Sequence, residues 1–431
     1  MTRETVHTWI FNGATFALAA VIPFSNRLTA LCIILLALNW LAEGRLKMKL
    51  KIACKDPFTI VCLLFYLLEL AGLLYTHDLR RGFYHAQTEA SFLVLPLIYG
   101  SPFSGRKLIV RKALVVFCAA VFLSSLYCVC LGVIRFLHTG DISFLFYHTL
   151  VSPINQHAVY FSIYTFICMA CLSDLLKTTR SGRMAVLITL LLVWFSGLLF
   201  LLRSKMVMCV TLLYACFQLV SIFIQRGSFR RRAVFPACII FGMLAALLTS
   251  NPFSRQLEEL RGNNFKVLEV QRFDPGDYFN EVQLRILLWK FSVGILNDAH
   301  CWLFGASPGD AQERLNGKIV SHNMYTGVPG TADSGFLDYN VHNQYLETLL
   351  RSGLAGLFLL LCILFFAFRN AVRARDIVLC SVLFVFACVF CTESVLERQF
   401  GIVPFFFFTC LLMPKSDGQK SLDKEEICRR S

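Results

Sequence analysis

The chain has 431 residues, of which 57% are hydrophobic and 41 are phenylalanine. A water-soluble domain of this size has too little interior to bury so much apolar surface, so the composition excludes a soluble protein and indicates an integral membrane protein. The formal net charge of +14 would favour a nucleic-acid partner in a soluble chain, but we expect no nucleic acid because the basic residues follow the pattern of membrane loops.

Apolar runs long enough to span a bilayer recur along most of the chain, and about twelve can be drawn. They cover residues 8–22, 28–43, 57–76, 87–101, 113–138, 157–176, 184–202, 206–225, 233–249, 345–368, 376–392 and 399–414. The sequence therefore predicts an all-α membrane protein with about nine helices in residues 1–249, one large loop at 250–341, three more helices in 342–414 and a polar tail at 415–431.

Lys and Arg residues alternate between the two sides of this predicted bundle. If the N-terminus is placed inside, the basic clusters all fall on the inner side: 45–55, 106–112, 177–183, 226–232, 369–375 and 415–430. Cytoplasmic loops of membrane proteins carry an excess of Lys and Arg. We therefore expect both termini in the cytoplasm and loop 250–341 on the outer side.

Loop 250–341 contains one stretch in which apolar residues recur at helical spacing: Leu284, Leu287, Leu288, Phe291 and Ile295. This spacing predicts an amphipathic helix over residues 282–295. Such a helix lies on the membrane surface or packs on the bundle.

The most informative feature is the polar run Asn340–Tyr345, where loop 250–341 returns to the membrane and places His342 at the boundary between water and lipid. Nine residues separate Asn343 from Gly353, and Gly356 follows. If the helix includes His342, Gly353 lies within about 20° of it around the axis, and the two glycines let a neighbouring helix approach that face closely. The pattern is compatible with a packing groove beside an interfacial histidine, and with a catalytic histidine.

A His-Asn pair, nine residues and Gly-x-x-Gly at the exit of a large outer loop resembles the signature of the O-antigen ligase and O-antigen polymerase superfamily. The stretches Arg285–Lys290 and Leu303–Asp310 follow in the order that this superfamily shows, and the resemblance extends over most of the chain. It implies the C-type glycosyltransferase fold in a multi-pass protein of the bacterial inner membrane. It also implies a periplasmic active site that transfers a glycan from undecaprenyl diphosphate to an acceptor hydroxyl, with no cofactor.

The implied glycan transfer requires two kinds of residue. A sugar on a lipid diphosphate is already activated, so the protein needs a base for the acceptor hydroxyl and positive charge for the departing diphosphate. His342 is the candidate base because histidine has a reference pKa near neutrality. The resemblance implies that the diphosphate is bound by a basic residue at an outer helix end, Arg203 or Lys205, and by Arg285. It implies supporting roles for Trp289, Asn343, Gly353 and Gly356.

Two interpretations of the basic residues stay open. Superfamily members commonly have Ser-Ser-Arg or Ser-Arg at the outer bend, whereas this chain has Arg203-Ser204-Lys205, so Lys205 takes the arginine position or the register shifts by two. A lysine there neutralises phosphate without the bidentate fork of arginine. Alternatively, Arg203 and Lys205 end two helices with side chains that reach the interface, and Arg285 lies on a solvated face.

Carboxylates inside the predicted spans have weaker implications. Glu347 and Arg351 are four residues apart and on a different face from His342, so we expect them to tie helices together. Glu69 is either a polar tie between helices or a lining residue of a lipid groove.

Other histidines have less definite roles. His157 and Tyr160 lie at the outer mouth of the sixth predicted span, where they seat a sugar or pack at the interface, and His322 is expected to be solvated. No cluster of His, Asp or Cys has the sequence spacing of metal ligands, so no metal is expected.

We expect an O-antigen ligase, which joins a whole glycan to a lipid A-core acceptor. A polymerase joins repeat units with the same constellation of residues. A protein O-oligosaccharyltransferase is less favoured because such chains tend to be longer. A transporter of lipid-linked glycans is the rival from another class, but transporters usually show two similar halves and broken helices near the midplane. The expected partners are the undecaprenyl-diphosphate-linked donor, a lipid A-core or glycan acceptor, and membrane lipid.

Overall fold

The computed structural model describes residues 2–101, 105–224, 264–331 and 333–414. Over these residues the chain is all-helical, without a strand, and seven helices are long and apolar enough to cross a membrane. The predicted span 233–249, the first part of loop 250–341 and the tail 415–431 lie outside the described residues.

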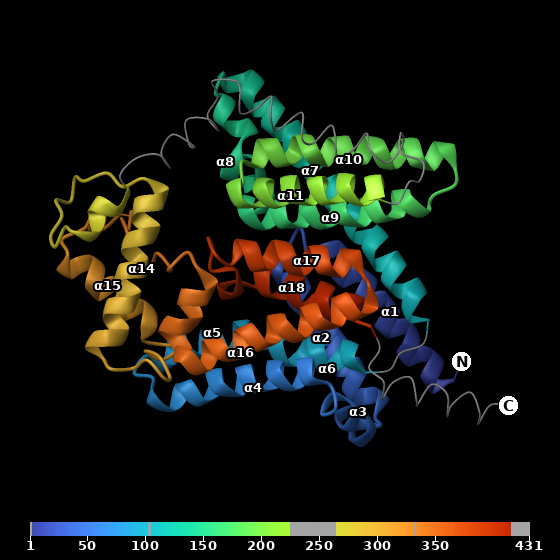
Figure 1. Cartoon of the computed structure of the whole chain (residues 1–431), viewed down its shortest axis with the longest axis horizontal. Coiled ribbons are helices and arrows are strands. Elements are labelled where there is room, and N and C mark those ends of the chain that lie inside the picture. Colours follow the sequence, from blue (N-terminus) through green and yellow to red (C-terminus); the bar gives the residue numbers. More distant parts are fainter. Residues whose placement is uncertain (1, 102–104, 225–263, 332, 415–431) are drawn as a thin grey trace.

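The helices follow one another in the order shown in Figure 1. The first part of the chain forms α1 (Arg3–Val21), α2 (Asn26–Glu43), α3 (Leu46–Ala53), α4 (Pro57–Gly72), η1 (Leu73–Tyr75), α5 (Leu79–Thr88), α6 (Ser91–Gly100), α7 (Arg106–Thr139), η2 (Ile142–Leu145), α8 (Tyr147–Val151), η3 (Ser152–Ile154), α9 (Ala158–Thr178), α10 (Gly182–Leu202) and α11 (Lys205–Ile224). The second part forms η4 (Asn264–Leu268), α14 (Glu281–Asp298), α15 (Ala311–Ser321), α16 (Gln344–Ala374), α17 (Ile377–Val389), η5 (Val395–Glu397) and α18 (Gln399–Leu412).

The all-helical architecture agrees with the sequence-based expectation, but the count of twelve spans is not confirmed. The seven membrane-length helices are α2, α4 with η1, α7, α9, α10, α11 and α16, whereas α17 and α18 are apolar but shorter. The predicted span 87–101 is wrong, because α5 ends at Thr88 and α6 begins at Ser91. Each of these two helices has ten residues and covers about 15 Å, half of a hydrocarbon core.

The centre of the bundle is formed by helices that are apolar on every side. All residues of α9 from Ala158 to Ser173 are buried, as are those of α18 from Gly401 to Leu411. α17 packs against both of them, α18 also packs on α6, and α16 packs on α4. A helix that is hydrophobic all round needs such an interior position.

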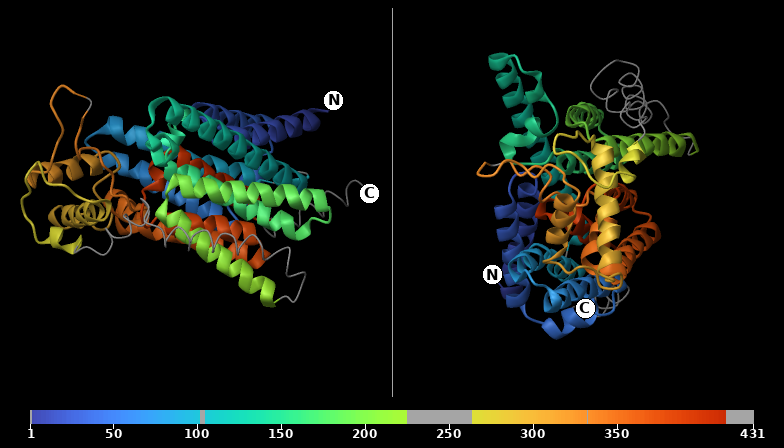
Figure 2. Two further views of the ribbon diagram at one scale, coloured as in Figure 1. Left: turned by 90° about the horizontal axis from the view of Figure 1, so that it is seen from above. Right: turned by 90° about the vertical axis from the view of Figure 1, so that its left-hand side faces the viewer.

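The two ends of the bundle differ (Figure 1). One end carries α8, α14, α15 and the bend between α10 and α11; we call it the α14 end. The opposite end carries the start of α1, the helix α3 and the connections from α9 to α10 and from α16 to α17 (Figures 1 and 2). The basic clusters 45–55, 177–183 and 369–375 of the sequence belong to that opposite end.

The helix predicted over residues 282–295 is confirmed as α14, which runs across the end of the bundle (Figure 1). Its N-terminus is closed by a capping box, in which Asn280 and Gln283 exchange hydrogen bonds with each other's backbone. The apolar face buries Leu287, Leu288 and Phe291 in a small core that α14 shares with α15 and the first turns of α16. α14 is therefore docked on the bundle by its own hydrophobic stripe.

Helix α16 is broken at Gly353, whose backbone is left-handed with φ 65° and ψ −164°. The break frees the carbonyls of Leu350 and Arg351, which accept hydrogen bonds from the N–H groups of Ala306 at 2.7 Å and Ser307 at 3.1 Å. Beyond the break, the N–H of Leu354 donates to the Trp302 carbonyl at 2.8 Å. The segment 302–307, which precedes α15, thus takes over the pairing that the helix gives up, as an apolar environment demands.

This close approach of two backbones depends on two glycines. A Cβ at Gly353 would lie 2.4 Å from the carbonyl group of Leu303, and a Cβ at Gly305 would lie 2.4 Å from that of Arg351. The predicted helix-to-helix contact through Gly353 and Gly356 is therefore wrong: Gly353 faces a loop, and the atoms nearest to a Cβ at Gly356 belong to its own helix.

Gly353→Ala should lower the melting temperature of the detergent-solubilised protein or prevent its accumulation. Alanine at a positive φ is strained by about 1–3 kcal/mol, and its Cβ also clashes with Leu303. The matched control is Gly197→Ala in α10, where a Cβ meets nothing within 4 Å and where alanine favours the helix by up to about 1 kcal/mol. Equal melting temperatures for the two variants would contradict the role of Gly353.

Candidate active site

His342 precedes α16 instead of belonging to it. Its backbone is left-handed, with φ 51°, and Asn343 is the N-cap residue, whose side-chain oxygen accepts from the N–H of Leu346 at 3.1 Å. The Asn343 amide also donates to the carbonyl of Cys391 at 3.1 Å. The predicted helical face that joins His342 to Gly353 is therefore wrong, because the helix starts after the histidine and breaks at the glycine.

The backbone before His342 is held from three sides. The indole N–H of Trp289 in α14 donates to the carbonyl of Val341 at 3.1 Å. The N–H of Val341 donates to Glu347 at 2.9 Å, and the same carboxylate oxygen accepts from Ser394 at 3.1 Å. Trp289 thus contacts the main chain next to the histidine, and Glu347 orders the same segment instead of pairing with Arg351.

The imidazole of His342 is paired with Glu393. Nδ1 lies 3.1 Å from Glu393 Oε2, and the other oxygen of that carboxylate accepts from Arg285 Nη2 at 3.1 Å. An ionised carboxylate only accepts hydrogen bonds, so Nδ1 carries the hydrogen and Nε2 is the nitrogen that can take a proton. The His342 side chain is 26% exposed, so solvent reaches it.

Glu393 is held as a carboxylate by its neighbours. Burial acts to raise the pKa of Glu393, but the hydrogen bond and charge of His342 and the charge of Arg285 outweigh it, and the pKa lies below the ordinary value. Glu393 therefore links the candidate base to the candidate diphosphate-binding arginine.

A second carboxylate joins the basic residues of α11 and α14. Glu281 lies 3.2 Å from Lys205 Nζ and 3.7 Å from Arg285 Nη1. Arg203 occupies the left-handed bend between α10 and α11, with its guanidinium 3.7 Å above the ring of Phe146. The three basic residues predicted for one site are thus brought to one place, with Lys205 linked to Arg285 and Arg203 stacked on an aromatic ring.

These basic residues line a cavity of about 870 Å³ between α11, α14 and η4. Arg203, Lys205, Arg285 and Lys290 contribute four positive charges, and Glu281 and Glu393 two negative ones. The rest of the wall is largely apolar and includes Val159, Met206, Cys209, Leu268, Val282 and Ile286. His342 is not a lining residue, and Glu393 stands between it and the cavity.

Two further histidines stack beside this site. The rings of His148 and His157 lie 4.1 Å apart, and His157 lies 5.4 Å from Tyr160. Burial and the neighbouring His148 lower the pKa of His157 to about 4, so this pair is neutral near pH 7 and presents flat aromatic surfaces.

His322 is partly buried, so the expectation that it is solvated holds only in part. Its ring lies 4.4 Å from that of Phe291, and its Nδ1 lies 2.8 Å from the carbonyl of Lys318. It packs α15 against α14.

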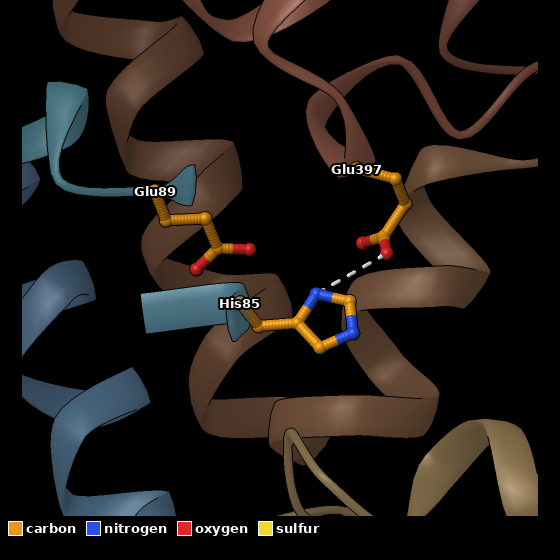
Figure 3. Close-up of side chains that lie close together, drawn as sticks. All are labelled: His85, Glu89 and Glu397. Carbon is orange, nitrogen blue, oxygen red and sulfur yellow. Dashed lines mark ion pairs between the residues drawn. The ribbon is translucent and has the colours of Figure 1, made fainter. Parts of the chain in front are cut away.

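Arg351, which was expected to tie helices together, and Glu69, for which a polar tie and a lipid groove were both open, belong to a buried network at the α14 end. Arg351 pairs with Glu69 at 2.8 Å and with Glu89 at 2.6 Å, and it also contacts Glu397. Glu397 in turn lies 3.6 Å from His85 (Figure 3). The fold thus brings Glu397 beside His85 and Glu89, which are four residues apart at the end of α5, so that three residues with metal-ligating atoms lie together.

Sequence reasoning missed Glu281 and Glu393, although both left a signal. Glu281 directly precedes the predicted helix 282–295 and is four residues before Arg285, the spacing of an intrahelical ion pair. Glu393 and Glu397 stand in the short connection between two apolar runs, on the side of the membrane predicted for His342. Comparison with protein-family models and with curated proteins finds no match for this sequence.

Replacing Glu393 with glutamine should destabilise the protein near neutral pH and have progressively less effect in acid. Because the folded-state pKa is depressed, the ionised carboxylate contributes stability above its unfolded-state pKa and loses it as pH falls through the folded-state pKa. Thermal unfolding of wild type and Glu393→Gln across this range measures the difference. The exposed Glu313→Gln is the control, and a difference that stays constant with pH would contradict the pairing.

Proposed function

We propose that the chain is a glycosyltransferase of the O-antigen ligase type, which transfers a glycan from undecaprenyl diphosphate to a hydroxyl of a lipid A-core acceptor at the periplasmic face of the bacterial inner membrane. The observation that carries the proposal is the chain of contacts His342–Glu393–Arg285, which links a solvent-accessible imidazole to a cationic cavity. A base and a diphosphate site are the two parts that this reaction requires.

The charges of the cavity match the donor. Four cations and two carboxylates line the cavity, so its wall has a net charge of two positive charges. A diphosphate that joins a lipid to a sugar carries two negative charges. As the bond between the anomeric carbon and the diphosphate breaks, the leaving group gains a further negative charge. Preorganised cations stabilise that developing charge, and Arg285 offers a planar fork that contacts two phosphate oxygens.

The lipid tail of the donor has an apolar path. Met206 and Cys209 of α11 line the cavity, and the exposed residues Leu213, Phe217 and Val220 continue along the same helix. Successive members of this group are three or four residues apart, which places all five on one face of α11. This face leads from the cavity along a membrane-length helix, so the diphosphate binds at the α14 end while the tail stays in lipid.

In the proposed reaction, Nε2 of His342 takes the proton of the acceptor hydroxyl while the hydroxyl oxygen attacks the anomeric carbon. The carbon–oxygen bond to the diphosphate breaks, its electron pair leaves with undecaprenyl diphosphate, and the configuration inverts. Glu393 holds Nδ1–H and stabilises the imidazolium that forms. The acceptor approaches from the solvent side of His342, and the donor occupies the cavity on the other side of Glu393.

The proposed orientation follows from the distribution of charge. The basic clusters at 45–55, 177–183 and 369–375 lie at the end opposite to α14 (Figure 1). Short loops rich in Lys and Arg stay in the cytoplasm, which leaves the α14 end in the periplasm. A transporter is less well supported: the break at Gly353 comes nine residues into the 31-residue α16, away from its middle, and a loop satisfies its backbone.

A strain that lacks the gene should lose every long lipopolysaccharide chain and accumulate lipid-linked polymer. Expression of the His342→Ala variant in this strain should leave the profile unchanged, because loss of a general base costs about 100- to 10,000-fold in rate. Expression of Glu393→Gln should restore few long chains. The exposed His138→Ala is the control and should restore the profile fully. A core that carries a single repeat would identify a polymerase, and a normal profile with His342→Ala would refute the catalytic role of this residue.

In a reconstituted transfer assay, Arg285→Ala should lower the rate by about 100-fold or more. Arg285→Lys should recover part of the rate, because a point charge replaces a planar fork. Of Arg203→Ala and Lys205→Ala, the variant with the larger loss identifies the residue that faces the diphosphate. Arg183→Ala, at the opposite end of α10, is the control. Normal transfer by Arg285→Ala, Arg203→Ala and Lys205→Ala would show that the diphosphate binds elsewhere.

A further inference from the structure

Arg351 is the cation at the centre of the buried network, and it is outnumbered by carboxylates. Nη2 contacts Glu69 at 2.8 Å and Glu89 at 2.6 Å, and Nη1 contacts Glu397. The exposed fraction of these four side chains ranges from 3% to 11%. One guanidinium against three carboxylates leaves two negative charges in excess, and buried charge without a partner is strongly unfavourable.

Glu89 and Glu397 each have an oxygen that Arg351 does not use, and these two carboxylates lie beside His85. Glu89 is only 4% exposed, and its Oε2 is buried without a hydrogen-bond partner. Oε2 of Glu397 lies 3.6 Å from Nδ1 of His85. Figure 3 shows the carboxylates of Glu89 and Glu397 directed toward one another, with the His85 ring between them. One ligand atom from each of these three residues lies within 4.8 Å of the others.

The geometry points to a divalent transition-metal site formed by His85, Glu89 and Glu397. An imidazole nitrogen with two carboxylate oxygens is a donor set for Zn²⁺ or Mn²⁺. Each glutamate uses one oxygen for Arg351 and offers the other to the metal, so the ion adds to the existing ion pairs and does not replace them. Two positive charges balance the two excess negative charges of the network.

The metal ties together two separate parts of the chain, the end of α5 and the loop between α17 and α18. His85 lies in α5, Glu89 follows α5, and Glu397 ends η5. Arg351 connects this group to the turn of α16 just before the break at Gly353. The ion is structural: it holds the α5–α6 junction against η5, and the paired residues His342 and Glu393 are not among its ligands.

The test uses full-length, tag-free protein in detergent micelles, stripped with a chelator and then dialysed against Zn²⁺ or Mn²⁺. Mass spectrometry of the elements should find about one ion per chain in the wild type, and the ion should raise the melting temperature, because ligands that bind only the folded state stabilise it. His85→Gln and Glu89→Gln should each bind almost no metal and show no such increase. His138→Gln, which changes an exposed histidine outside the cluster, is the control and should behave as wild type.

Two outcomes would overturn the site. If the wild type binds neither ion, the excess charge is balanced by protons on the carboxyl groups, and Glu89→Gln then leaves the melting temperature unchanged or raises it. If His85→Gln and Glu89→Gln bind as much metal as the wild type, the ion lies elsewhere. Glycan transfer does not enter either measurement, so the result is independent of the proposed function.

Discussion

A backbone that leaves its helix inside an apolar bundle must find new hydrogen-bond partners, and the α14 end is arranged around that requirement. The groups freed at Gly353 pair with segment 302–307, which connects α14 to α15. Asp310, at the end of this connection, accepts from the N–H groups of His77 and Asp78, and the hydroxyl of Tyr75 donates to the carbonyl of Phe304. Through these contacts the helix that carries Arg285 and Trp289 is fixed against the helix that follows His342.

The short loop between α17 and α18 contributes one carboxylate to each of two electrostatic networks at this end. Glu393 pairs with His342 and Arg285, whereas Glu397, four residues later, contacts Arg351 and lies near His85. The first network is partly open to solvent and lies beside the cavity, and the second is enclosed. Since both carboxylates belong to the connection between α17 and α18, a shift of η5 would disturb them together. The enclosed network therefore holds Glu393 in position against His342.

The sequence was sufficient for features that depend on local spacing and insufficient for those that depend on distant pairing. The apolar stripe of α14 was predicted from its periodicity, and the grouping of Arg203, Lys205 and Arg285 was implied by the resemblance to the superfamily. The continuous face from His342 to Gly353 was wrong, because the left-handed backbone of Gly353 is set by a loop more than forty residues earlier. Glu393 was missed for the same reason, since it meets Arg285 across 108 residues of chain.

The position of Glu393 between base and cation has a consequence for the proposed reaction. Without substrate, Arg285 divides its charge between Glu281 and Glu393. A bound diphosphate competes with both carboxylates for the guanidinium, and every contact that Arg285 makes with phosphate weakens its hold on Glu393. The carboxylate then interacts more strongly with His342 and favours the imidazolium that the proton transfer creates. In the proposed reaction, binding of the donor would thus prepare the base, so that His342 would be most effective when a leaving group is in place.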